Sequence, residues 1–164
     1  MKRHVIAWAL ATVLSGQSSG ALAEESKAPP NDEESFKLFR ASMRMEKRDF
    51  VKESMNLSEQ ESAKFWTVYH QYEAELMKLT DRRMKLIEDY AASFDSMTEA
   101  KAAQLAKSGF ELHRARTNLL ENYYKKMAKA LSNRIAVRFA QVESVSNAAV
   151  DMDLGAAIPL MPKD

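Results

Sequence analysis

The residues of this chain that could hold a metal ion are few and widely spaced. Beyond the N-terminal His4 there are only two histidines, His70 and His113, and there is no cysteine, H-x-x-x-H or C-x-x-C pair. If both histidines lie on paired antiparallel helices, about 12 Å of helix axis separates them, which is too far for one shared ion in a monomer. His70 could still meet Glu73 on its next turn and Glu121 across the pair, so a metal site there stays open.

The sequence also lacks a set of residues suited to catalysis. There is no cysteine nucleophile, no glycine-rich phosphate loop, and no histidine with a matching serine and aspartate. Most acidic residues stand three or four positions from a basic one, which is typical of solvated helix faces. The sequence therefore predicts a protein that is not an enzyme and that has no cofactor.

Two arginines fall at positions where the surrounding pattern is apolar. Arg83 and Arg116 could contact an anionic ligand, or they could pair with carboxylates such as Asp81 and Glu75. A polar residue in an apolar seam can set the register of two packed helices. We favour this structural role over a ligand contact.

The first 23 residues have the pattern of a signal peptide. Lys2 and Arg3 precede an apolar run, Val5 to Leu14, that is too short to cross a bilayer, and small residues lead to cleavage after Ala23. An uncleaved anchor is the less favoured alternative. We therefore expect an exported, periplasmic protein with no integral membrane segment after cleavage.

Charge and cysteine content restrict the possible partners. Cleavage removes two of the 24 basic residues and none of the 23 acidic ones, which leaves a net charge near −1. A nearly neutral chain has no field to attract nucleic acid. Without cysteine the fold cannot use disulfides in an oxidising compartment, so apolar packing must hold it together.

Composition divides the chain into four parts. We expect a signal peptide over residues 1–23, a disordered acidic leader over 24–34, one helical domain over 35–150, and an extended tail over 151–164. The tail contains one glycine and two prolines, which disfavour regular structure.

Apolar spacing predicts an all-α fold. From Phe65 to Tyr90 apolar residues return at a spacing close to 3.5, as in helices packed side by side in a coiled coil. We expect a long antiparallel helical hairpin, over about 58–93 and 98–131, flanked by shorter helices before and after it. A turn near residue 95 would place Tyr72 opposite Leu119.

Two helix starts are marked by capping residues. Ser58 can cap the second helix while Glu61, three residues later, reaches back to the Ser58 amide, which is the capping-box pattern. Thr98, after Met97, can cap the third helix.

The first helix combines basic residues with methionine. Flexible thioethers suit surfaces that adapt to varied apolar partners. The candidate contact residues for a client or partner protein are Lys37, Arg40, Met43, Arg44, Lys47 and Arg48.

The two capped segments carry a family resemblance. Leu57-Ser58-Glu59-Gln60-Glu61 and Met97-Thr98-Glu99-Ala100-Lys101 resemble the paired L-T-x-x-Q motifs of the CpxP/Spy periplasmic helical-hairpin family. The first copy has serine for threonine and glutamate for glutamine, and the second departs at its first and last positions. The resemblance implies an antiparallel helical homodimer that acts as an ATP-independent chaperone or as an envelope-stress modulator.

Two other functions remain open. One is a metal-responsive periplasmic sensor or accessory domain, which would use His70. The other is a structural module that binds a single dedicated partner and is inert towards unfolded proteins in general.

Overall fold

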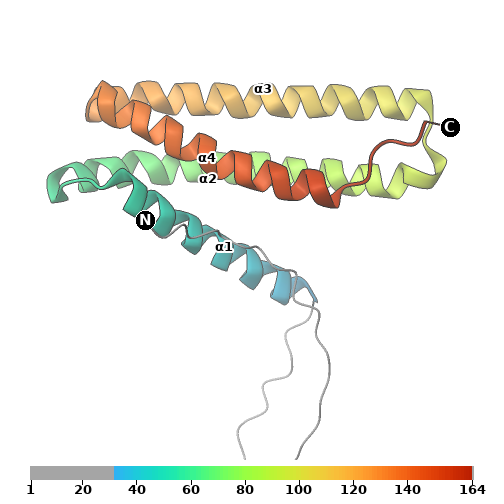
Figure 1. The fold of residues 1–164 in the computed structure, drawn as a ribbon, viewed down its shortest axis with the longest axis horizontal. Coiled ribbons are helices and arrows are strands. Elements are labelled where there is room, and N and C mark those ends of the chain that lie inside the picture. Colours follow the sequence, from blue (N-terminus) through green and yellow to red (C-terminus); the bar gives the residue numbers. More distant parts are fainter. Residues whose placement is uncertain (1–31, 164) are drawn as a thin grey trace, which may run out of the picture.

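The structure, a computed structural model, describes residues 32–163, and every regular element in that range is helical. The order is α1 (Asp32–Met55), α2 (Glu59–Ser93), the short 3₁₀ turn η1 (Phe94–Ser96), α3 (Glu99–Ala130) and α4 (Asn133–Ala157) (Figure 1). The all-α class is therefore confirmed. The expected signal peptide and residues 24–31 of the expected leader lie outside the described residues.

Helices α2, α3 and α4 form one layered body, and helix α1 extends from it. Helices α2 and α3 run side by side in opposite directions, with η1 at the turn, and α4 crosses over them (Figure 1). Helix α1 packs on α4 near the end of the body opposite η1, and its N-terminal half runs outward from the other helices. The geometry leaves much of α1 and the outer side of α4 in contact with solvent.

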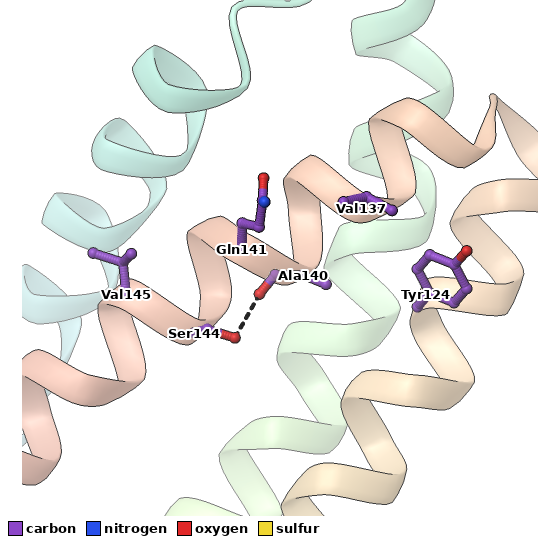
Figure 2. Close-up of a pocket in the computed structure, with 6 residues that line it drawn as sticks. All are labelled: Tyr124, Val137, Ala140, Gln141, Ser144 and Val145. Carbon is purple, nitrogen blue, oxygen red and sulfur yellow. Dashed lines mark hydrogen bonds between the residues drawn. The ribbon is translucent and has the colours of Figure 1, made fainter.

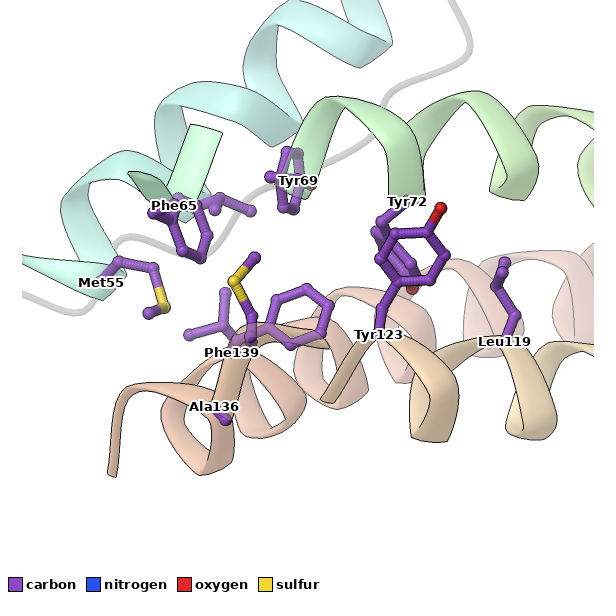
Figure 3. Packing of buried hydrophobic residues seen from close by; sticks show 11 residues of the cluster. Met55, Phe65, Tyr69, Tyr72, Leu119, Tyr123, Ala136 and Phe139 are labelled. Carbon is purple, nitrogen blue, oxygen red and sulfur yellow. The ribbon is translucent and has the colours of Figure 1, made fainter. Parts of the chain in front are cut away.

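The apolar core lies where all four helices meet. Figure 3 shows the connected side chains, which are Val51, Met55, Phe65, Tyr69, Tyr72, Leu119, Tyr123, Met127, Ala136, Phe139 and Val142. The ring of Phe139 lies 5.2 Å from that of Tyr72, edge to face, which is a favourable aromatic geometry. Each of these large side chains contributes about 1.5–3 kcal/mol through burial. Helix α1 reaches this core only through its last two turns.

The register of α2 against α3 differs from the expected one by about one helical turn. Tyr72 packs on Tyr123, at 5.4 Å between ring centroids, instead of facing Leu119. The hydroxyl of Tyr123 also donates a 2.6 Å hydrogen bond to Glu75. The difference arises at the turn between the two helices. Because η1 is followed by the cap at Thr98, the chain reverses about two residues later than a turn centred near residue 95 would.

The helical region extends further than expected at both ends. Helix α1 begins at Asp32, within the expected leader. Helix α4 continues to Ala157, so the extended tail starts at Ile158 and not at residue 151. Ile158 precedes Pro159, and proline forces the residue before it out of the helical conformation.

The chain leaves α1 through a left-handed residue. Asn56 has a φ of 46°, and its amide donates a 3.3 Å hydrogen bond to the Lys52 carbonyl. Asparagine tolerates this conformation better than most residues, so it ends α1 cleanly. Leu57 then packs against the core, and α2 begins.

Candidate functional site

The most unusual polar group of the molecule is a carboxylate inside the apolar core. The Glu143 side chain is 0% exposed, and both of its oxygens are hydrogen-bonded. Tyr69 donates to Oε1 at 3.0 Å, and Tyr72 donates to Oε2 at 2.7 Å. The ammonium of Lys47, from α1, lies 2.9 Å from Oε2. Helices α1, α2 and α4 therefore meet at one buried charge.

The neutral hydroxyls of Tyr69 and Tyr72 favour a structural role for the cluster around Glu143. Burial raises the pKa of Tyr69 and of Tyr72 well above the usual tyrosine value, and the nearby negative Glu143 raises both further. Both hydroxyls are consequently neutral donors at physiological pH. Inside the core, a carboxylate with a cation and two donors is satisfied, whereas one that loses a partner is costly. This geometry ties three helices together and presents no group to a substrate.

A second set of contacts joins α1 to α2 in a regular series. Arg48 binds the Glu73 carboxylate through two nitrogens, with Nε at 2.9 Å from Oε1. One turn back, Arg44 donates to the sulfur of Met77 at 3.4 Å, and a further turn back Arg40 pairs with Asp81. We call Arg40, Arg44 and Arg48 the arginine ladder. Steps of four residues on both antiparallel helices keep all three contacts on one line.

The structure places most of the expected contact residues of α1 on its inner side. Arg40, Arg44 and Arg48 form the arginine ladder, and Lys47 reaches Glu143. These four residues hold α1 in place. Of the other two, Lys37 is exposed and Met43 is half-buried.

Three of the residues on which the resemblance rests, Ser58, Glu61 and Thr98, cap helices. The Ser58 amide donates to Glu61 at 2.9 Å and the Glu61 amide donates back to the Ser58 hydroxyl, so the predicted capping box is confirmed. Thr98 caps α3, where its hydroxyl accepts from the Lys101 amide at 3.2 Å. Met97 is half-buried at the preceding position. Capping alone explains why these residue types occur at both helix starts.

The three residues considered for a metal site are directed to different partners. His70 lies beside Trp66, at 5.7 Å between ring centroids, while Glu73 pairs with Arg48 and Glu121 pairs with Lys125. Within residues 32–163 no three histidine, cysteine, aspartate or glutamate side chains are grouped as metal ligands. The structure thus does not bring His70, Glu73 and Glu121 together.

Arg83 and Arg116 share one carboxylate, and it is not one of those expected. Asp151 on α4 lies 2.6 Å from Arg83 and 3.1 Å from Arg116, so α2, α3 and α4 meet there. Burial alone would raise the pKa of Asp151, but the two arginines outweigh it and lower the pKa below its usual range. Asp151 was expected in the extended tail, which is why the sequence did not suggest this pairing.

Exposed apolar side chains are the surface feature that the sequence analysis missed. Among the described residues the large ones are Leu38, Phe39, Met45, Phe110, Val137, Val145, Val150, Met152, Leu160 and Met161. Seven of these ten belong to α1 and α4. A shallow depression of about 570 Å³ is lined by Val137 and Val145 of α4 and by Tyr124 of α3. Figure 2 shows how these side chains lie. The sequence of α4 does indicate exposed apolar side chains, because it contains more apolar residues than one buried stripe of a helix can hold.

Comparison with known proteins adds no assignment. No family model matches the chain, and neither the curated proteins nor the solved structures contain a match. Within the described range, no helix combines the length and the apolar character needed to cross a membrane.

Proposed function

We propose that this protein is an exported, periplasmic binding module that holds apolar segments of unfolded or partner proteins without ATP. The observation that carries the proposal is the exposed apolar surface of α1. Leu38, Phe39 and Met45 are 59%, 56% and 64% exposed, on a helix whose N-terminal half projects from the body (Figure 1). Contiguous apolar side chains on a soluble surface are typical of sites that bind other proteins.

The inward contacts of α1 support this assignment. Since the arginine ladder and Lys47 anchor the inner side of the helix, the apolar side chains of the outer side remain available to a partner. Met45 adds a flexible thioether, which adapts to apolar partners of different shape. The candidate surface therefore shifts from the basic side of α1 to its apolar side, with Lys37 at its edge.

The likeness to the CpxP/Spy family belongs to the same proposal. Two long antiparallel helices whose starts are capped by Ser58 and Thr98 support a hairpin of that type. The signal-peptide pattern over residues 1–23 supports export to the periplasm. A chaperone-like or stress-modulating role follows from the combination of export with an exposed apolar helix.

An aggregation assay with a matched control tests the proposal. The exported form of the protein is added, without ATP, to a heat-stressed client while light scattering is followed. We expect suppression near equimolar ratio, and the variant Leu38→Ser/Phe39→Ser should need about tenfold more protein for the same effect, because two apolar contacts are lost. The control Phe110→Ser/Leu160→Ser removes the same two residue types from exposed positions on α3 and the tail.

Either of two results would overturn the proposal. One is a folded wild-type protein that does not suppress aggregation at any ratio, which would favour a single dedicated partner. The other is an equal loss in the control variant, which would show that general hydrophobicity, and not α1, accounts for the effect.

A further inference from the structure

Charge is distributed unevenly between the two ends of the body. Residues 86–100, around η1, contain four acidic residues and no basic one. At the opposite end of the body, where α3 turns into α4, residues 122–142 contain five basic residues and no acidic one (Figure 1). We call these five exposed residues the basic corner, and they are Lys125, Lys126, Lys129, Arg134 and Arg138.

The positive charge of the basic corner is largely uncompensated. Lys125 pairs with Glu121, while the other four residues form no ion pair within residues 32–163. The α1–α2 turn lies at the same end of the body, and residues 51–65 there contain two basic and three acidic residues. That turn and Glu121 each offset one positive charge, so this end keeps a net charge near +3.

A groove with apolar walls lies within the basic corner. Its volume is about 610 Å³, and Arg134 and Arg138 of α4 line it. The apolar side chains that line it are Met55, Leu57, Ile135 and Val137. The one carboxylate in the lining, Glu61, accepts a 2.9 Å hydrogen bond from the Ser58 amide and so belongs to the cap of α2. The groove therefore combines two exposed guanidinium groups with apolar surface.

We propose that the basic corner docks this protein on the surface of membranes that contain anionic phospholipid. Such a surface presents a layer of phosphates above apolar acyl chains, which complements cations that stand beside apolar side chains. Lipid phosphate would meet Arg134 and Arg138, and the 45% exposed Val137 would lie at the level of the headgroups. Because the η1 end is acidic, the same surface repels it, and the body docks with η1 directed away from the membrane.

Docking on lipid is independent of client binding. The basic corner shares no residue with the apolar side of α1, and of the proposed function it rests only on export, which brings the protein to a membrane surface. Vesicle binding and the light-scattering assay can therefore fail separately.

Co-sedimentation with vesicles tests the proposal. At low ionic strength the exported form should bind phosphatidylglycerol vesicles at least about tenfold more tightly than phosphatidylcholine vesicles, and added salt should weaken this binding. The variant Lys126→Gln/Lys129→Gln/Arg134→Gln should weaken it about 100-fold, at about fivefold for each cation. The control Arg82→Gln/Lys85→Gln/Lys107→Gln removes the same three residue types from exposed positions elsewhere and should bind within about threefold of wild type.

A fluorescent label tests the orientation, and the chain has no cysteine of its own to interfere. A polarity-sensitive fluorophore on Val137→Cys should shift to the blue with phosphatidylglycerol vesicles, whereas the same label on Asp95→Cys, in η1, should not.

Four results would overturn the proposal. They are absence of binding to phosphatidylglycerol at low ionic strength, equal binding to phosphatidylcholine, an equal loss in the control variant, and an equal shift of the label in η1. Release of the protein from vesicles by poly-L-glutamate at an equal concentration of charge would also overturn it, and would assign the basic corner to an acidic protein.

Discussion

Glu143 is fully buried, and its hydrogen-bonding partners come from two other helices. A buried carboxylate of this kind contributes little net stability while all of its partners are present, but it is costly when one is removed. Lys47 is the cation among those partners. Its loss leaves a negative charge in the aromatic core with only the two tyrosine hydroxyls as donors.

We expect Lys47→Met to lower the free energy of unfolding by about 3 kcal/mol, since methionine retains most of the apolar stem but not the charge. Urea unfolding followed by circular dichroism measures this. The double variant Lys47→Met/Glu143→Gln should recover about half of the loss, because a neutral amide does not need a cation. A change within about 0.5 kcal/mol in the single variant would contradict the structural role of the pair.

At the scale of elements, α1 is attached to the body in two different ways. Its last turns are anchored in the core by Val51 and Met55, which are 0% and 2% exposed. Its middle is held by the arginine ladder, whose members are partly exposed and therefore contribute on the order of 1 kcal/mol each or less. The middle of α1 should consequently separate from α2 much more easily than its C-terminal end.

Reversing the ladder charges tests this difference. The variant Arg40→Glu/Arg44→Glu/Arg48→Glu places carboxylates opposite Glu73 and Asp81, and we expect amide hydrogen exchange over 34–50 to accelerate about tenfold or more. Exchange in the middle of α2 and α3 should stay close to wild type.

The matched control reverses three lysines that form no ion pair within residues 32–163. These are Lys52, Lys64 and Lys107. The net change in charge equals that of the ladder variant, so equal acceleration in both variants would mean that overall charge, and not the ladder, governs α1.

At the scale of the whole molecule, three core tyrosines link stability to alkaline pH. Burial and the neighbouring carboxylate of Glu75 raise the pKa of Tyr123 to about 12, and the pKa values of Tyr69 and Tyr72 are raised as well. The folded state binds these protons more tightly than the unfolded state, where tyrosine titrates near 10. The contribution of Tyr123 is therefore complete below about pH 10 and is lost as the pH rises through 12.

We expect the free energy of unfolding to fall steadily above about pH 10. Urea unfolding at a series of pH values, with tyrosinate absorbance recorded in parallel, measures this. In Tyr123→Phe the decline between pH 10 and 12 should be flatter by up to about 1.4 kcal/mol per pH unit, because one linked proton is gone. An unchanged slope would mean that Tyr123 titrates alike in both states.

The amino-acid sequence by itself determined the features that depend on near neighbours. Ser58 and Thr98 cap their helices through contacts with residues three positions away, and a 3.5-residue apolar spacing can be recognised within a single helix. The all-α class and the number of helices follow from these local signals. Helix α4 ends later than the sequence predicts, since Pro159 disfavours the helical conformation only at the residue before it.

Only the tertiary structure decided which charged residues face inward. The partners of Glu143 lie 71 to 96 residues away in the chain, and nothing in local spacing connects them. The sequence predicts a binding surface at the arginines of α1, because a basic stripe on one helix has the same sequence pattern whether solvent or an acidic helix lies opposite it. In the structure these arginines contact Asp81, Met77 and Glu73 of α2, while Leu38, Phe39 and Met45 of α1 remain exposed.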